Sequence, residues 1–183
     1  MKKISADRIV SVSAIIVSIF TLLMIFYQTS LTRRHQRASV MPSLEIGYST
    51  KKKNDRLNES IWVSNKGLGP AFLEKISIIE DGQTLNMDPY EFLSKTPART
   101  EVTYFDKLYP GRIIPANEGI TTFEKVTDST SQIIIGNIFK FSFKTGQTTN
   151  DGSERALIEI IYKSVYGEKW KIRSDQSTPA KID

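Results

Sequence analysis

A run of 19 residues from 9 to 27 constrains this chain more than any other feature, because all but four of them are apolar. The four are Ser11, Ser13, Ser18 and Thr21, and no charged residue interrupts the run. A helix of that length measures about 28 Å, which is close to the ~30 Å hydrocarbon core of a bilayer. The run therefore predicts one membrane-spanning helix and divides the chain into an anchor and a soluble part.

Two other structures contain runs of this kind. A cleaved signal peptide has an apolar stretch of about 7 to 15 residues and a small-residue cleavage site. This run is longer, and residues 28–34 offer no such site. A core helix would alternate apolar and polar faces, which this run does not. We therefore expect an uncleaved anchor whose membrane-embedded residues include Ile9, Ile15, Phe20, Leu23, Phe26 and Tyr27.

The excess positive charge lies beside the predicted anchor. Residues 1–41 contain six Lys and Arg and one Asp, which accounts for the whole net charge of +5. Residues 42–183 contain 19 basic and 19 acidic residues and are neutral. A neutral domain lacks the positive surface of a nucleic-acid binder, so nucleic acid is not an expected partner. Arg33, Arg34 and Arg37 are instead expected to contact lipid headgroups, at about 1 kcal/mol for each basic residue.

The basic residues that flank the run bear on the membrane side of the soluble part. Three precede it and three follow it closely, so the bias that keeps Lys and Arg in the cytoplasm is balanced. Lys51, Lys52 and Lys53 lie just beyond and favour a cytoplasmic soluble domain, with an extracytoplasmic one as the alternative. We expect a single-pass protein of the cell (inner) membrane.

Short segments of alternating apolar and polar residues fill the rest of the chain. The clearest is 138–144, where Phe139, Phe141 and Phe143 alternate with Lys and Ser. Residues 88–93 predict one helical turn with Asp88 as N-cap, and residues 51–56 predict a charged turn. Further strands are expected at 43–50, 60–64, 72–80, 83–87, 101–108, 120–126, 155–165 and 169–173.

These strands come with few helices and no βαβ rhythm. The pattern predicts a mainly β fold, an immunoglobulin-like antiparallel β-sandwich, with a small β-barrel as the alternative. The expected order is a short basic N-terminus (1–8), the transmembrane helix (9–31), a basic juxtamembrane segment ending at Pro42 (32–41), the sandwich (42–175) and a flexible tail (176–183).

Three segments carry a resemblance to known proteins. They read RHQRASVMP at 34–42, directly after the single span, NKGLGPA at 65–71 and YKSVYG at 162–167. The chain resembles a loose group of uncharacterised bacterial single-pass membrane proteins with an immunoglobulin-like β-sandwich domain. The resemblance implies that fold and membrane tethering, and no activity. The cysteines of a true immunoglobulin domain are absent, so the likeness is to the architecture.

Patterns for catalysis and metal binding are missing from the sequence. His35 is the only histidine and there is no cysteine, so neither a zinc site nor a Ser-His-Asp hydrolase is expected. No G-x-S-x-G or H-E-x-x-H pattern occurs. A glycosidase-like pair of carboxylates remains open, because strand spacing does not show which carboxylates meet. We expect a protein that is not an enzyme and holds no metal or cofactor.

The predicted function is a membrane-tethered, non-catalytic protein-interaction module, an accessory or assembly subunit at the bacterial inner membrane. Its partners would be the bilayer and an unknown protein, which could add a strand to a sheet edge. The candidate partner-binding loop contains Asn65, Gly67, Gly69 and Pro70. The alternative is a ligand-sensing membrane effector, for example in phage defence. A large apolar cavity with convergent polar groups would favour the alternative, and a filled core with an unpaired, uncharged edge strand would favour the interaction module.

Overall fold

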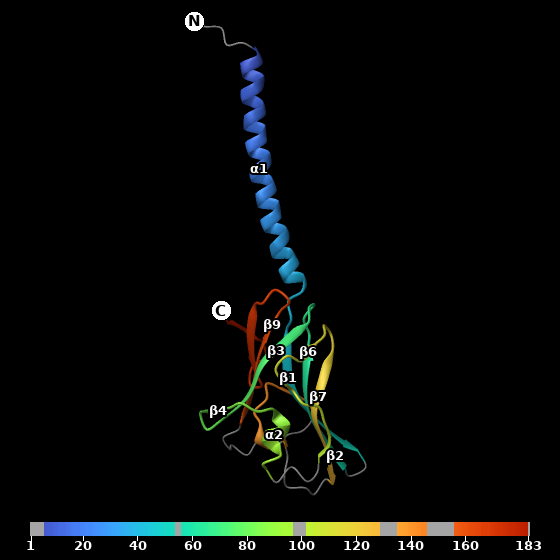
Figure 1. Cartoon of the computed structure of the whole chain (residues 1–183). Coiled ribbons are helices and arrows are strands. Elements are labelled where there is room, and N and C mark those ends of the chain that lie inside the picture. The colour runs from blue at the N-terminus through green and yellow to red at the C-terminus, as the bar shows by residue number, and fades with distance from the viewer. Residues whose placement is uncertain (1–5, 54–55, 97–101, 129–134, 146–155, 183) are drawn as a thin grey trace. The chain divides into compact units, whose positions relative to one another are not determined.

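The computed structural model describes residues 6–53, 56–96, 102–128, 135–145 and 156–182 (Figure 1). It divides into two compact units, Met1–Ser39 and Val40–Asp183. The first contains the long helix α1 (Ala6–Ser39), and the second contains all the described strands.

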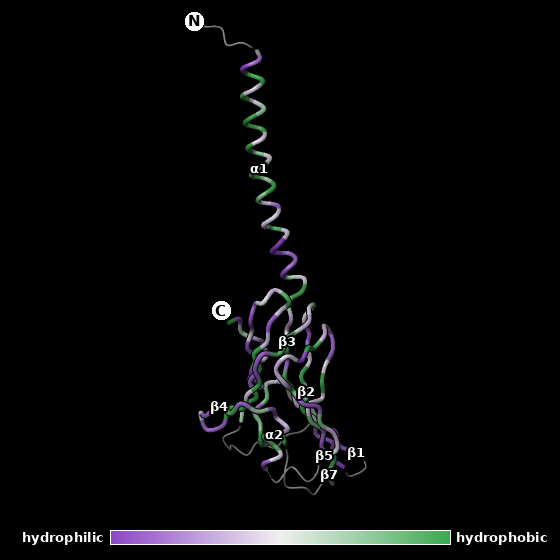
Figure 2. The backbone as a smooth tube through the Cα atoms, in the orientation of Figure 1, coloured by the Kyte–Doolittle hydropathy of each residue, from purple (hydrophilic) through white to green (hydrophobic). Residues whose placement is uncertain are grey.

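Helix α1 runs without a break through the apolar run and the basic segment that follows. Its residues Asp7–Ser39 are long and apolar enough to cross a membrane, and the apolar window is not buried inside the protein. Figure 2 shows hydrophobic residues along most of the helix, giving way to hydrophilic ones near its C-terminal end. The hydroxyls of Ser11, Ser13, Ser18 and Thr21 each donate to the carbonyl four residues earlier, so they need no water.

The second unit consists of two sheets. Sheet A has the order β5-β7-β2-β1-β8, and sheet B has the order β11-β10-β9-β3-β4, with β6 also paired to β3. Every strand pair is antiparallel except β1 with β8. The strands are β1 (Leu44–Lys53), β2 (Arg56–Asn65), β3 (Ala71–Glu80), β4 (Gln83–Leu85), β5 (Val102–Phe105), β6 (Ile113–Ile114), β7 (Gly119–Asp128), β8 (Phe143–Thr145), β9 (Leu157–Lys163), β10 (Lys169–Arg173) and β11 (Ala180–Ile182).

The core lies between the two sheets and follows from the alternation of each strand. In β9, Ile158, Ile160 and Tyr162 are buried, while the residues between them are half-buried on the outer side. Each buried side chain of this size contributes about 1.5–3 kcal/mol to folding. The predicted fold is confirmed: the protein is mainly β, with two antiparallel sheets that do not close into a barrel, after a single apolar helix.

Two short helices complete the described part of the chain, α2 (Pro89–Leu93) and α3 (Ile135–Ile138). The predicted cap of α2 is confirmed, because the Asp88 side chain accepts a hydrogen bond from the Glu91 N–H at 2.7 Å. Two predictions are wrong. Lys51, Lys52 and Lys53 belong to β1 rather than to a turn. The polar tail contains β11, which pairs with β10.

The predicted strand at 138–144 is also wrong for most of its length. Phe139 and Phe141 are buried and Lys140 is exposed, so the alternation of side chains is as predicted. The backbone, however, forms no full ladder, and Ile138 belongs to α3. Phe139 bridges Ala156 beside sheet B, and only Phe143–Thr145 pairs with β1 in sheet A. The segment crosses between the sheets, and alternation alone does not reveal whether a neighbouring strand is present.

Candidate functional site

Residues 40–43, the junction segment, carry the chain from α1 into β1 and are fastened to the loop between β2 and β3. The Lys66 N–H donates to the Ser43 carbonyl at 2.8 Å. The Leu68 N–H donates to the Met41 carbonyl at 3.0 Å. The first residues of the second unit are therefore part of the folded sandwich and not a loose linker.

Gly67 and Gly69 make this close approach possible. A Cβ added to Gly69 would lie 1.8 Å from the Val40 carbonyl oxygen, and one added to Gly67 would lie 2.4 Å from the Met41 carbonyl oxygen. Both neighbours are backbone atoms, which cannot turn aside. Glycines in a sequence of this kind are expected in turns that need a positive φ, but neither Gly67 nor Gly69 has a positive φ. Their role is close contact between two backbone segments.

Asn65 lies at the centre of the junction and is fully buried. Its Oδ1 accepts from the N–H groups of Ser43 at 3.1 Å and Gly67 at 3.0 Å. Its Nδ2 donates to the carbonyls of Gly69 at 2.8 Å and Ile114 at 3.0 Å. One amide therefore joins the junction segment, the β2–β3 loop and β6.

These positions show which residues of the predicted partner-binding loop a partner could contact. Asn65, Gly67 and Gly69 are buried, and Pro70 is half-buried. The loop presents Lys66 and Leu68 to its surroundings, and Leu68 is 68% exposed. The loop holds the junction together, and a partner that touches it meets only these two exposed side chains and the edge of Pro70.

The predicted membrane and headgroup residues all lie on α1. Ile9, Ile15, Phe20, Leu23, Phe26 and Tyr27 are each more than half exposed, so nothing in the protein covers them. Arg33, Arg34 and Arg37 have the three- and four-residue spacings that place side chains on one helix face. They share that face with Phe26 and Ser30.

Tyr162 secures the start of β1. Its ring is buried beside Trp170, with ring centroids 6.0 Å apart, and its hydroxyl oxygen accepts from the Leu44 N–H at 3.2 Å. Burial raises the pKa of Tyr162 to about 12, although the hydrogen bond from Leu44 acts in the opposite direction.

The free energy of unfolding is expected to fall between pH 10 and 12 because of Tyr162. The pKa of this phenol is near its ordinary value of 10.0 in the unfolded chain and near 12 in the folded chain, so the folded state holds the extra proton in that window. The loss amounts to about 2–3 kcal/mol. In denaturant titrations, Tyr162→Phe should have a lower free energy of unfolding at neutral pH, because the Leu44 N–H loses its acceptor. Above pH ~10, however, the free energy of unfolding of this variant should fall less than that of the wild type. Equal declines would contradict the assignment.

A groove of about 560 Å³ lies beside β7, beyond the end of β5. Its walls include Asp106, Arg112 and Glu118. Arg112 donates from Nη1 and Nη2 to the two carboxylate oxygens of Asp106, each at 2.6 Å, and its guanidinium carbon is 5.8 Å from the centre of the Tyr109 ring. These hydrogen bonds lower the pKa of Asp106 and raise that of Arg112. The one guanidinium in the groove is therefore already held by a carboxylate.

The start of β7 presents an open backbone edge to this groove. Strand β5 pairs with β7 at residues 123–125, and the Asp106 N–H just beyond β5 donates to the Thr122 carbonyl at 3.1 Å, so the open stretch of β7 is residues 119–121. On the other side, the Asn65 N–H donates to the Glu118 carbonyl, which makes these two a hydrogen-bonded pair of the β2–β7 ladder. The ladder alternates, so the N–H and C=O of Gly119 point away from β2 and into the groove. Within the described part of the chain, no backbone group bonds to Gly119 from that side.

A buried charged cluster lies toward the opposite end of sheet A. Glu59 and Lys125 are both fully buried and face each other across β2 and β7. The Tyr48 hydroxyl and the Ile135 N–H both donate to Glu59 Oε1, the latter at 2.8 Å. Directly opposite residues have Cβ atoms about 5 Å apart, so the two charged side chains start side by side in the core. No sequence pattern marks this cluster, because charges at alternate strand positions usually lie on a solvated face.

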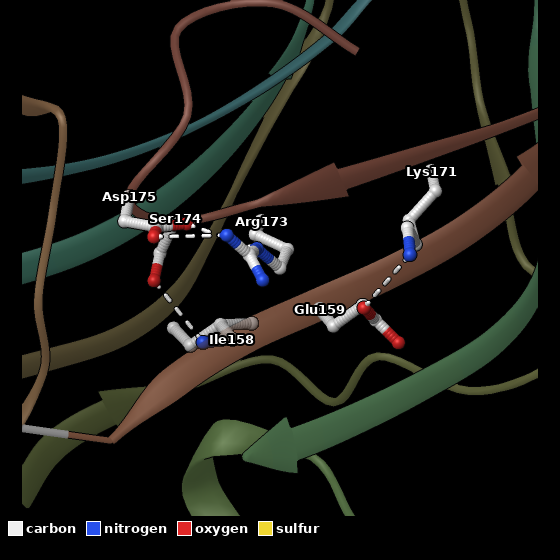
Figure 3. A network of polar contacts seen from close by, with 6 residues as sticks. All are labelled: Ile158, Glu159, Lys171, Arg173, Ser174 and Asp175. Atoms are coloured by element: carbon white, nitrogen blue, oxygen red, sulfur yellow. Dashed lines mark hydrogen bonds and ion pairs between the residues drawn. The ribbon is translucent and has the colours of Figure 1, made fainter. Parts of the chain in front are cut away.

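The outer face of sheet B is occupied by ion pairs within the domain. Lys171 Nζ lies 3.7 Å from Glu159 Oε2, and Arg173 Nε lies 3.1 Å from Asp175 Oδ1. Figure 3 draws both pairs. Glu74 lies within ion-pair distance of two further lysines, whose hydrogen bonds lower its pKa. Exposed pairs of this kind contribute little to stability. They do, however, satisfy the charges of this face and leave fewer for a charged partner.

Among the described residues, no three His, Asp or Glu side chains gather as a metal site. No protein-family model matches the chain, and no curated protein matches it either. The resemblance to single-pass bacterial sandwich proteins therefore stays a prediction, and the geometry described above is what supports a function.

Proposed function

We propose that the chain is a membrane-tethered, non-catalytic interaction module whose sandwich binds an extended segment of a protein partner at the open edge of β7. Helix α1 supplies the tether, because it is long and apolar enough to span a membrane. In this proposal the protein is an accessory or assembly subunit of the bacterial inner membrane with the sandwich in the cytoplasm. Digestion of the sandwich by protease added outside the cell would overturn that orientation.

The observation that carries the proposal is the outward-facing backbone of Gly119 in the groove. An unpaired strand edge is a template for another strand, whose backbone supplies the hydrogen bonds. The exposed Ile113 on the facing wall of the groove offers an apolar contact to such a strand.

A small-molecule ligand is the second candidate for the groove. Its volume of about 560 Å³ is within the range of about 300–1,000 Å³ for ligand pockets. Such pockets are lined mainly by apolar and aromatic side chains. This groove includes Tyr104, Ile113, Ile114, Pro115 and Ile120 in its walls, but the surface that it exposes is mainly polar, with the carboxylates of Asp106, Glu118 and Glu124 and with Arg112 already paired. Its chemistry suits a polypeptide backbone better than an apolar ligand.

Gly119→Pro is expected to weaken partner binding about tenfold. Proline removes the outward N–H, and a lost hydrogen bond of about 1.4 kcal/mol corresponds to that factor. The β2–β7 ladder does not use this N–H, and proline is tolerated at strand edges. The measurement is quantitative recovery of partners with the full-length protein from native membranes.

Gly119→Ala is the matched control, because it keeps the N–H. Its Cβ would meet Ser64 and Val63 no closer than 3.4 Å, an ordinary contact. Partners recovered equally with wild type and Gly119→Ala, and depleted with Gly119→Pro, are those that bind the edge. If both variants recover the same partners in the same amounts, the open edge of β7 is not the binding site.

A further inference from the structure

Five large apolar side chains are exposed at the end of the sandwich where the chain arrives from α1. We call them the junction patch, and each is 43–68% exposed: Met41, Leu68, Ile113, Val165 and Tyr166. Outside α1, only Tyr104, Phe105 and Tyr109 are comparably exposed among the described large apolar residues. Exposed apolar side chains gathered in one region mark a surface that something else covers.

Strand pairing brings the five residues to one end of the sandwich. Leu68 is bonded to Met41 through the backbone. Ile113 pairs with Phe72 at the start of β3, and Phe72 pairs with Lys163 at the end of β9. The turn that follows β9 carries the last two members of the patch. Figure 1 shows this turn and β6 at the end of the sandwich where β1 begins.

The chemistry of the patch is that of a membrane–water interface. Its segments, residues 40–43, 65–70, 113–114 and 164–167, contain Lys66 and no acidic residue, although Ile113 also lines the groove that contains Asp106, Glu118 and Glu124. Glu168 follows the last segment, but it pairs with Lys181 at 3.5 Å. Aliphatic residues with tyrosine and lysine are typical of protein surfaces at the level of lipid headgroups, where an apolar body and a polar tip are both accommodated.

We propose that the junction patch lies in the headgroup layer of the bilayer that α1 spans, so that the sandwich contacts the membrane at this end. The inference rests on the proposed membrane tether. The bilayer is favoured over a protein as the occupant because only residues 40–43 separate α1 from β1, and these are bonded into the sandwich. The chain itself therefore keeps the patch near the lipid surface.

The helical stretch between the apolar run and the junction has to take a particular orientation if the patch is to reach the headgroups. Residues 28–39 cover about 18 Å of helix axis, whereas the headgroup layer is roughly 5–8 Å thick. Because α1 is unbroken and its apolar run has to cross the bilayer, contact requires α1 to bend after Tyr27, so that this stretch lies nearly along the membrane surface. Arg33, Arg34 and Arg37 favour an inclined position, because attraction to anionic headgroups draws them toward the surface.

The test uses nitroxide labels on single cysteines, which the cysteine-free chain makes specific. Leu68→Cys and Tyr166→Cys report on the patch, and Gln83→Cys in the β3–β4 hairpin, at the far end of β3, is the matched control. The full-length protein is reconstituted in vesicles of phosphatidylcholine and phosphatidylglycerol. We expect the ratio of collisions with oxygen to collisions with a water-soluble nickel chelate to be several-fold higher at the two patch positions. Unchanged Trp62 and Trp170 emission verifies the fold.

Other outcomes overturn the inference in distinguishable ways. Equal collision ratios at all three positions mean that the patch is in water. Labels shielded from both oxygen and nickel mean that protein, such as a second copy, covers the patch. If the protein is washed from the vesicles by alkaline carbonate, the tether itself fails and the proposed function falls with it. If the protein stays and the patch labels are in water, only the patch inference fails.

Discussion

Asn65→Ala is expected to lower the free energy of unfolding by about 4 kcal/mol. The side chain makes four hydrogen bonds in a buried position, and each contributes about 0.5–1.5 kcal/mol net. The loss is large because Ser43, Gly67 and Gly69 belong to segments in backbone contact, so no other side chain can move in to replace the amide. Denaturant titration of the full-length protein in detergent, followed by Trp62 and Trp170 emission, measures it.

Asn65→Asp distinguishes the acceptor role of the amide oxygen from the donor role of the amide nitrogen. An aspartate keeps the acceptor for Ser43 and Gly67 but turns an oxygen toward the carbonyls of Gly69 and Ile114. Only the protonated acid can donate to one of them, so the folded state raises the pKa of this carboxyl. Because the folded state then binds more protons, the stability of this variant should fall as pH rises above about 4. The stability of the wild type should not show this decline.

Asn58→Ala is the matched control for both variants. Asn58 is half-buried and donates one side-chain hydrogen bond, to Glu124 at 2.7 Å. Its removal should cost about 1 kcal/mol or less. If Asn65→Ala costs no more than this control, water replaces the amide, and the junction does not depend on Asn65 for its stability.

The parts of the fold that the sequence predicts are those with local causes. Asp88 caps α2 because its side chain reaches an N–H three residues away. Helix α1 ends at Ser39, shortly before Pro42, as the rule for residues preceding proline predicts. Strand β10 has the predicted bounds, because alternation and its flanking turn coincide there.

The functional features depend on residues far apart in the chain, and no local pattern shows them. Asn65 reads as a turn residue, yet its role depends on Ser43 and Ile114. The open edge of β7 exists because β5 is shorter than its neighbour, a property of two segments and not of either one. The junction patch combines a loop, a turn and a two-residue strand. In each case the sequence contains the residues, but only the strand order shows which of them meet.

Lys125→Met is expected to lower the free energy of unfolding by about 3–5 kcal/mol, the usual cost of leaving one buried charge without its opposite charge. Methionine fills most of the space of the lysine stem, so the loss reflects charge more than volume. Glu59 would then be an anion in the core, held by the Tyr48 hydroxyl and the Ile135 N–H.

A second substitution distinguishes the loss of charge balance from a packing defect. Glu59→Gln keeps an oxygen that accepts from Tyr48 and Ile135 while removing the negative charge. Because neutral pairs in a core are often as stable as the charged pairs they replace, the double variant Lys125→Met with Glu59→Gln should recover most of the stability lost by Lys125→Met alone. A coupling energy of about 2 kcal/mol in this cycle is the expected result. Additive losses would show that Glu59 and Lys125 are buried independently and that their charges do not stabilise each other.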